Sequence, residues 1–535
     1  MFDLLIRNGR LVDGSGNPWR YGDVAIQGEY IAAVGSLADA QAKRVIDAEG
    51  KLVCPGFIDA HSHTDVTVEL NPFFESTIRQ GITTEVVGNC GNSTAPFPQD
   101  GNGGFGKFGD LPVPYGRTLG EHMAALERRG MSANLGWLVG HNTLRTIAGI
   151  QGRTYTQEQY DKMASALRGA LEDGALGMSS GLEFEPGRAS GPEELLRLAG
   201  ELKPYDAIYT SHIRNRDAKV LDALDEFLAV IRKHRIRGEV SHMNIRHNTH
   251  APEGAVQRCM EKIQQARDEG LEVLTDMTPL NFGIGSMAGI LPEGLSAVPP
   301  QELAAALRDP AVRQRLRGDC DRYWRFIHNG EWERVRMQSN AAFPELNGLT
   351  FPEIAAKWGK DPWDCYFDIL AANAPDIGQI VLVSRLFTDE HLAETISHPL
   401  YMLVVDGYST AADGAVAEGT GFPLHYIGMA WFLTHHVREK GTLRLEEAVR
   451  KMTSMPAEHF RLAQRGLLAE GYYADLCIFG EDTLETPFDL LNPRQYTKGM
   501  DYVLVNGVMV LEQGRHLRAT PGRNLRFRGK GAGAR

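Results

Sequence analysis

The chain has 535 residues and a formal net charge of −12, with 43% hydrophobic and 23% charged residues. This composition is typical of a globular protein, and the acidic balance argues against nucleic-acid binding, which needs basic residues to meet phosphates. No apolar run approaches the roughly 20 residues of a membrane helix, and the start "MFDLLIRNGRLVDG" lacks a signal-peptide pattern. Six scattered cysteines do not form a disulfide framework, so we expect a cytoplasmic protein in a reducing compartment.

Both ends of the chain have the alternation of β-strands. "DLLIRNGRLVDG" places apolar residues around Asn8-Gly9, and "YVLVNGVMVLEQG" does the same around Asn506-Gly507. Asn-Gly is the strongest signal of a two-residue hairpin, so we predict a hairpin at each position. The basic end of the chain, "GRNLRFRGKGAGAR", is predicted to be a solvated, poorly ordered terminus.

Between the two ends, short apolar strands alternate with helices. The spacing of Thr156 and Gln159 predicts a capping box at a helix start, and Ser190 and Glu193 predict a second one. Eight strands follow one another from "GFIDAH" to "YMLVVDG" if "QIVLVS" is treated as an extra strand. Strands that alternate with helices form parallel sheets, and eight of them predict an α/β protein with a closed (β/α)8 barrel.

This alternation also predicts the domain boundaries. Residues 1–56 with 455–535 are expected to form a small β-sandwich domain from both chain ends, and 57–454 the barrel. The alternation breaks from about residue 282 to 349. We interpret the stretch 282–349 as an insertion after the seventh strand that acts as a lid over the barrel mouth.

Residues of metal-binding type stand at the ends of five predicted strands. In "GFIDAHSHTD", the alternation of side chains along a strand places His61 and His63 on the same face. Each of the others ends an apolar strand of its own: Cys90, His212, His242 and Asp406. A single histidine is usually structural and a free cysteine is usually a small buried hydrophobe. Six such residues at the carboxyl ends of barrel strands, where catalytic groups gather, predict a metal site.

The residue types also select the metal. Imidazoles, a thiolate and a carboxylate suit Zn²⁺ better than Ca²⁺ or Mg²⁺, which prefer oxygen ligands. Six candidate ligands exceed one tetrahedral site, so either two ions share the pocket or one occupied site lies beside a weak one. Zinc lowers the pKa of a bound water to about 7 and polarises a carbonyl, so hydrolysis of an amide needs no protein nucleophile.

At these residues the sequence resembles the amidohydrolase superfamily and, within it, the D-aminoacylases, which are N-acyl-D-amino-acid deacylases. The resemblance runs from Met1 to about residue 512. It rests on seven segments in the family's order: "PGFIDAHSHTD", "GITTEVVGNCG", "VGHNTLR", "SGLEFEPGRAS", "YTSHIR", "EVSHMN" and "GYYADLCIF". It implies a zinc ion held tightly by Cys90, His212 and His242, with the cysteine in the place of the carboxylated lysine of many other amidohydrolases.

The resemblance also implies a second, weaker or empty site at His61, His63 and Asp406, with Cys90 as the candidate bridge. Asp406 is the candidate general acid and base, because the family uses the matching aspartate in this role. A carboxylate beside the attacking water can accept its proton and deliver it to the departing nitrogen. The alternative for an aspartate that precedes a glycine is a turn former.

The reaction that the resemblance implies is hydrolysis of a linear, non-peptide C–N amide bond in a small N-acyl-D-amino acid or related N-acyl amine. Two segments depart from the family. "TDMTPL" replaces an Asp-Ala-Tyr-Pro-Tyr segment and "GYSTAADG" replaces one with His-Pro-Arg, and both family segments hold the substrate carboxylate. The candidate substrate-binding residues are Arg214, His141, Arg145 and Glu183, with Arg188 and Arg246 as further cations. An arginine near a barrel mouth can equally pair with structural acids.

Two other functions stay open at this point. A cyclic-amide hydrolase of the hydantoinase or dihydroorotase type, or a lactone hydrolase, would use the same metal chemistry. A metal-free scaffold that kept the fold would have lost ligands, whereas all six are in place. The sequence leaves open the acyl group, D or L stereochemistry, the number of metal ions and assembly into a homo-oligomer.

Overall fold

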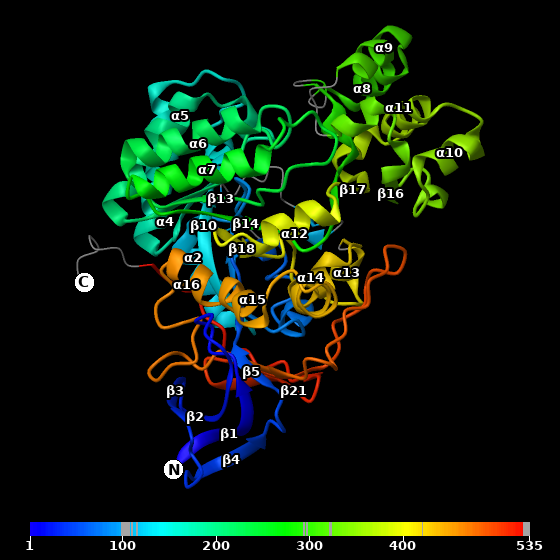
Figure 1. Cartoon of the computed structure of the whole chain (residues 1–535). Helices are drawn as coiled ribbons and strands as arrows, with labels where there is room; N and C mark the ends of the chain where they lie inside the picture. The colour runs from blue at the N-terminus through cyan, green and yellow to red at the C-terminus, as the bar shows by residue number, and fades with distance from the viewer. Residues whose placement is uncertain are drawn as a thin grey trace. The chain divides into compact units, whose positions relative to one another are not determined.

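The computed structural model describes residues 1–97, 107–108, 111–113, 116–292, 295, 298–319, 324–419 and 421–527. The chain divides into two compact units (Figure 1). The first comprises Met1–Asn244, Glu253–Pro279 and Ala393–Arg535, and the second comprises Ile245–Pro252 and Leu280–Leu392. Within the described ranges, no helix is both long enough and apolar enough to cross a membrane.

The central sheet of the first unit is a barrel of eight parallel strands, paired in the order β18-β14-β13-β12-β11-β10-β7-β6. The strands are β6 (Phe57–Asp59), β7 (Ile82–Val87), β10 (Asn134–Gly140), β11 (Gly177–Gly181), β12 (Ile208–His212), β13 (Gly238–Val240), β14 (Val273–Met277) and β18 (Tyr401–Leu403). Every residue in them is buried, as expected for parallel strands covered on both faces. The predicted (β/α)8 barrel is confirmed.

The barrel closes just beyond the ends of its first and last strands. Asp406 N donates to His61 O at 2.9 Å, and His63 N donates to Gly407 O at 2.8 Å. Ser62 and Gly407 form a parallel bridge between these hydrogen bonds. Closure therefore takes place at three of the predicted metal ligands.

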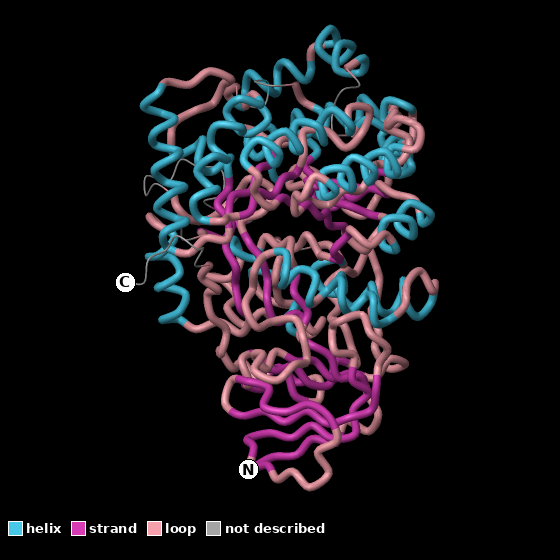
Figure 2. The backbone as a smooth tube through the Cα atoms, turned by 60° about the vertical axis from the view of Figure 1, so that its left-hand side comes forward, coloured by secondary structure: helices cyan, strands magenta, loops and turns pink. Residues whose placement is uncertain are grey.

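Helices lie outside the barrel strands (Figure 2). They are α1 (Glu75–Ile78), α2 (Leu119–Arg129), α3 (His141–Ile147), α4 (Gln157–Asp173), α5 (Pro192–Leu198), α6 (Val220–His234), α7 (Ala255–Asp268), α12 (Asp389–Ser397), α13 (Ala415–Glu418), α14 (Leu424–Trp431), a π-helix (Phe432–Glu439), α15 (Leu445–Met452) and α16 (Ser454–His459). A short hairpin, β8 (Lys107–Phe108) with β9 (Leu111–Pro112), belongs to the same unit.

One of the two predicted capping boxes is present. The Thr156 side chain accepts from Gln159 N at the start of α4, and the Gln159 side chain accepts from Thr156 N. The second prediction is wrong, because α5 begins at Pro192 with Gly191 as its N-cap. The Ser190 hydroxyl donates to a carbonyl of the preceding turn instead.

Strands from both chain ends share one further sheet, as predicted. It has the order β22-β21-β20-β19-β5-β1-β2-β3, with β4 paired to β1. Its strands are β1 (Phe2–Leu11), β2 (Arg20–Gln27), β3 (Tyr30–Gly35), β4 (Ala42–Asp47), β5 (Leu52–Pro55), β19 (Leu476–Phe479), β20 (Met500–Val505), β21 (Val508–Glu512) and β22 (Arg515–His516). The two ends of the chain meet where β5 pairs antiparallel with β19. The domain boundaries 1–56 with 455–535 and 57–454 stay predictions.

The two Asn-Gly dipeptides have different structures. Asn506 and Gly507, with φ of 49° and 77°, form the two-residue turn between β20 and β21, as predicted. The hairpin predicted at Asn8-Gly9 is wrong, since β1 continues through both residues with a shift in register against β2. β1 is held there on both sides by β2, β4 and β5, and Asn8 Nδ2 donates to Asp47 Oδ1 at 3.0 Å.

The end of the described chain returns to the barrel. Asn524 bridges to Leu135 of β10, and its Oδ1 accepts from Trp137 Nε1 at 2.8 Å. The prediction of a solvated terminus is therefore wrong for residues 522–527, while 528–535 lie outside the described residues.

The second unit contains a three-stranded antiparallel sheet and four α-helices among its described residues. Its elements are β15 (Phe282–Ser286), β16 (Val335–Ser339), β17 (Val381–Arg385), α8 (Pro300–Arg308), α9 (Pro310–Gly318), α10 (Phe351–Trp358) and α11 (Pro362–Ala372). β17 comes from "QIVLVS", which lies outside the barrel as predicted. The unit extends to Leu392, beyond the predicted insertion at 282–349, and the lid function stays a prediction.

Candidate metal centre

Cys90 lies in a tight turn after β7 that requires glycine on both sides. A Cβ on Gly88 would lie 2.1 Å from Leu138 O, and one on Gly91 would lie 2.5 Å from Asn142 Oδ1. Cys90 itself has a left-handed backbone, with φ of 51°. Non-glycine residues adopt this conformation rarely and mostly where surrounding structure enforces it, which is typical of functional sites.

Two histidines converge with the Cys90 thiol to form the first group of donors. Cys90 Sγ lies 3.3 Å from His242 Nε2 and 3.6 Å from His212 Nδ1, and the two nitrogens are 3.0 Å apart. With Zn–S of about 2.3 Å and Zn–N of about 2.0–2.1 Å, tetrahedral ligand atoms lie about 3.3–3.7 Å apart. The two sulfur–nitrogen distances match this spacing, and the nitrogen–nitrogen distance of 3.0 Å is somewhat shorter, so the three donors are near the arrangement that one zinc ion requires.

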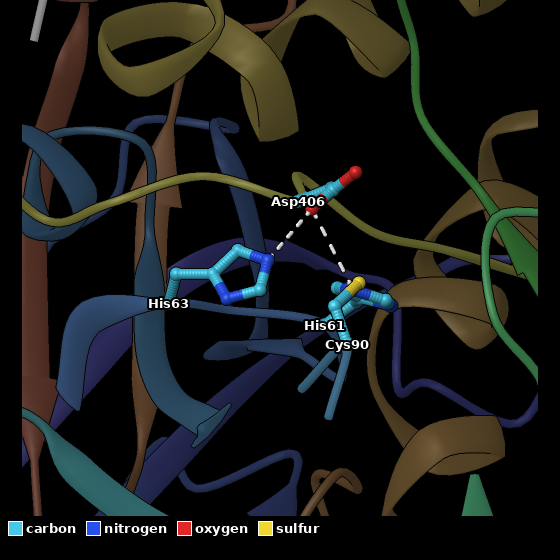
Figure 3. A group of neighbouring side chains, drawn as sticks. All are labelled: His61, His63, Cys90 and Asp406. Carbon is cyan, nitrogen blue, oxygen red and sulfur yellow. Dashed lines mark hydrogen bonds and ion pairs between the residues drawn. The ribbon is translucent and has the colours of Figure 1, made fainter. Parts of the chain in front are cut away.

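The second group of donors, drawn in Figure 3, shares the Cys90 thiol with the first group. His61 Nε2 is 3.3 Å from Cys90 Sγ and 3.5 Å from Asp406 Oδ1. Asp406 Oδ1 is also 3.1 Å from His63 Nε2. The structure thus brings all six predicted ligands together in two groups joined at Cys90.

The two groups differ in their access to solvent. Cys90, His212 and His242 are buried, whereas the side chains of His63 and Asp406 are 18% and 27% exposed. The first group is the better shielded from competing water, and the second group faces the open side of the centre.

The electrostatics of the first group favour metal binding. Burial by itself raises the pKa of the Cys90 thiol, but His61 and His242 outweigh burial and hold this pKa well below its usual range. Burial, followed by the nearby charge of Arg216, lowers the pKa of His242 to about 4. Thiolate and neutral imidazole are the forms that bind zinc.

Comparison with known proteins gives the family. Residues 44–308 and 411–511 match the amidohydrolase family. The N-acyl-D-glutamate deacylase of Alcaligenes xylosoxydans xylosoxydans is 33% identical over 540 residues, which cover 99% of this chain and 98% of that protein. The chain belongs to the amidohydrolase family.

Two solved structures are similar to this amidohydrolase over nearly its whole length. The N-acyl-D-glutamate deacylase from Bordetella bronchiseptica, complexed with zinc and a phosphonate mimic of the tetrahedral intermediate, has a TM-score of 0.80 and 30% identity. The match covers 98% of this chain and 99% of the chain of that deacylase. A D-aminoacylase has a TM-score of 0.81 and 26% identity, and the match covers 98% of this chain and 100% of that chain. That structure is described by its binuclear metal center, with activation by one metal and attenuation by the second. The resemblance to the D-aminoacylases is confirmed.

Glu183, a predicted substrate-binding residue of the amidohydrolase, contacts a histidine that is a candidate metal ligand. Its Oε2 lies 2.7 Å from His212 Nε2. An imidazole that donates from Nε2 to a carboxylate keeps the lone pair of Nδ1, the atom that faces Cys90. Glu183 therefore orients His212, and a direct contact with substrate stays a prediction.

Arg214, the predicted partner of a substrate carboxylate, is paired with an acid of its own chain. Its Nε and Nη2 each donate to Glu226 at 2.9 Å, and its Nη1 donates to Arg188 O at 2.8 Å. This bidentate pair occupies the two N–H donors that would otherwise bind a substrate carboxylate in the same way. Arg246 belongs to the second unit.

His141 and Arg145, also predicted to bind substrate, share one buried acid. Glu194 Oε1 lies 2.8 Å from His141 Nε2, and its Oε2 accepts from Arg145 Nη1 at 2.6 Å. All three side chains are at most 1% exposed. The contacts are those of a structural ion-pair network next to the strand end of β10, and substrate binding by either residue stays a prediction.

The sequence reasoning missed two residues that touch candidate ligand histidines. Asp276 near the end of β14 lies 3.1 Å from His61, and Arg216 lies 3.0 Å from His242 Nδ1. The strand-end signal that found the ligands also applied to Asp276 in "LEVLTDM". Arg216 stands in a loop after β12, where the sequence offers no such signal.

The buried network at Glu194 gives a first prediction. Glu194→Gln should lower the free energy of unfolding by about 3–5 kcal/mol, because it leaves the Arg145 guanidinium buried without a counter-charge. Denaturant unfolding measures this loss, and Glu193→Gln on the exposed face of the same helix is the matched control. Unchanged stability combined with a large rise in KM would show instead that the network binds substrate.

Proposed function

We propose that this protein is a zinc-dependent hydrolase that cleaves the linear amide bond of an N-acyl-D-amino acid or a related N-acyl amine, releasing a carboxylate and an amine. The observation that carries the proposal is the convergence of thiol, imidazole and carboxylate donors around Cys90 at the rim of an amidohydrolase barrel. The relatives that match along nearly the whole chain, an N-acyl-D-glutamate deacylase and a D-aminoacylase, support this substrate class.

Cys90, His212 and His242 would hold one zinc ion tightly. Their burial, and a spacing that suits tetrahedral ligands, support this assignment. The second group would form a weaker site, because two of its side chains are partly open to water. The two-metal centre of the similar D-aminoacylase, with activation by one metal and attenuation by the second, supports the same arrangement.

Asp406 would act as the general base and then as the general acid. Burial raises the pKa of Asp406, but His61 and His242 outweigh it and hold this pKa below its usual range, so the carboxylate is ionised before the reaction. A bound zinc ion would activate the attacking water and polarise the substrate carbonyl. Asp406 Oδ2, which lies on the side away from His63, accepts the proton of the water and delivers it to the leaving nitrogen.

A hydrolase of neutral or cyclic amides is the second candidate. The pairing of Arg214 with Glu226 favours it, because this guanidinium is already engaged. The replacement of the family's tyrosine and His-Pro-Arg segments by "TDMTPL" and "GYSTAADG" supports the same candidate.

A substrate comparison with the zinc-loaded protein tests the proposed function. We expect hydrolysis of N-acetyl derivatives of D-glutamate, D-aspartate or D-leucine, with the L-enantiomers, a hydantoin and a lactone as competing substrates. Activity should disappear on chelation and return with zinc. Turnover of the hydantoin or lactone alone would replace the proposed function with the second candidate.

The ligand assignment gives a second prediction. Cys90→Ala, His212→Ala and His242→Ala should each lose most of the bound zinc and nearly all activity, since one of three protein ligands is removed. Elemental analysis after dialysis measures zinc content. Full zinc content with normal turnover in any one of these variants would remove that residue from the tight site.

The role of Asp406 gives a third prediction. Asp406→Asn should retain the tightly bound zinc but reduce kcat by about two orders of magnitude or more, as expected when a general acid and base is lost. Steady-state kinetics at matched zinc content measures the change. A kcat within a few-fold of the unmodified protein would exclude Asp406 from proton transfer.

The pairing of Arg214 gives a fourth prediction. Because Glu226 occupies its guanidinium, Arg214→Met should change kcat/KM by the same factor for an N-acetyl-D-amino acid and for the matching amide without a carboxylate. A loss confined to the carboxylate substrate, of about 10- to 150-fold, would instead show that Arg214 binds that carboxylate. Glu226→Gln serves as the control for loss of the internal pair.

A further inference from the structure

We propose that Asp276 is a positioning residue that holds one ligand histidine in each group of donors. Its side chain is fully buried on β14, on the strand next to that of His242. One of its oxygens, Oδ2, lies 3.1 Å from His61 Nδ1, and the other, Oδ1, accepts from the backbone N–H of His242. This inference deepens the proposed zinc site and rests on it.

The contact with His61 sets which ring nitrogen can bind a metal. A carboxylate only accepts, so the proton lies on Nδ1 and the lone pair on Nε2. Nε2 is the atom that lies 3.3 Å from Cys90 Sγ. A carboxylate behind a metal-binding histidine fixes the ring orientation and raises the basicity of the ligand nitrogen.

The contact with His242 supports an unusual backbone. His242 has φ of 34°, in the left-handed region that non-glycine residues rarely adopt. The ladder between β13 and β14 ends at Val240 and Thr275. Beyond that point, Asp276 accepts from His242 N through its side chain and from Met243 N through its carbonyl at 2.9 Å. Asp276 thus continues the pairing of the two strands through the ligand position.

A second buried carboxyl nearby provides a control for the substitution of Asp276. Glu239 is also buried, and one of its carboxylate oxygens lies within 4.8 Å of a ring nitrogen of His61 and of a carboxylate oxygen of Asp276. It accepts a hydrogen bond from Ser241 Oγ at 3.0 Å. Burial and the charge of Asp276 hold the pKa of Glu239 well above its usual range, so this acid is neutral. Glu239→Gln therefore alters a buried neighbour of both residues without changing the charge, while the two contacts of Asp276 with the histidines stay in place.

The test compares Asp276→Asn with Glu239→Gln in the full-length protein. In Asp276→Asn the amide oxygen can still accept from His242 N, but the amide nitrogen is a donor and faces His61 Nδ1. The proton of His61 is then favoured on Nε2, where it blocks metal binding. Zinc titration against a chelating indicator measures the two affinities, and thermal unfolding of the metal-free protein measures the fold.

We expect Asp276→Asn to weaken the second zinc by about 10- to 100-fold, to change the first by no more than a few-fold, and to leave the metal-free Tm within a few degrees. Glu239→Gln should leave both affinities within a few-fold. Unchanged zinc affinity in Asp276→Asn, or an equal loss in Glu239→Gln, would overturn the positioning role but leave the proposed function intact. Unmodified protein that binds no zinc would overturn both.

Discussion

The first and last barrel strands, β6 and β18, meet through backbone hydrogen bonds made by three of the candidate metal ligands. Asp406 N donates to His61 O, and His63 N donates to Gly407 O. Neighbouring strands lie about 4.8 Å apart, so closure brings side chains at adjacent strand ends within reach of one ion. Three of the six candidate ligands, Cys90, His242 and Asp406, also have left-handed backbones. Each such residue costs roughly 1–3 kcal/mol and persists where its surroundings determine the conformation, as the closed barrel does here.

The three deeper histidines each have a partner at the ring nitrogen that faces away from the thiol. Glu183 contacts His212 and Asp276 contacts His61, so carboxylates fix two of the rings. Arg216 lies against the third, and its positive charge adds to burial in keeping the imidazole neutral. The two carboxylate partners explain how His61 and His212 can converge in a buried space and still present a lone pair on the ring nitrogen that faces the thiol.

The same buried space limits what the nearby arginines can do. A guanidinium that loses its water must be paired, and this chain supplies Glu226 to Arg214 and Glu194 to Arg145. Two of the four arginines that could replace the family's carboxylate-binding segments are thus engaged by internal acids. Substrate selection therefore depends on whether a substrate carboxylate can compete with these pairs.

The sequence by itself determined the eight barrel strands and the six donor residues. A parallel barrel places the carboxyl end of every strand on one rim, and the residue types at those ends can be identified directly in the sequence. It could not determine which contacts are made across long separations. Asn506-Gly507 forms the expected turn, but Asn8-Gly9 remains in a strand because three neighbouring strands hold it. Asp276 was equally visible as a strand-end acid, yet its position behind His61, 215 residues away in the chain, was decided only when the barrel closed.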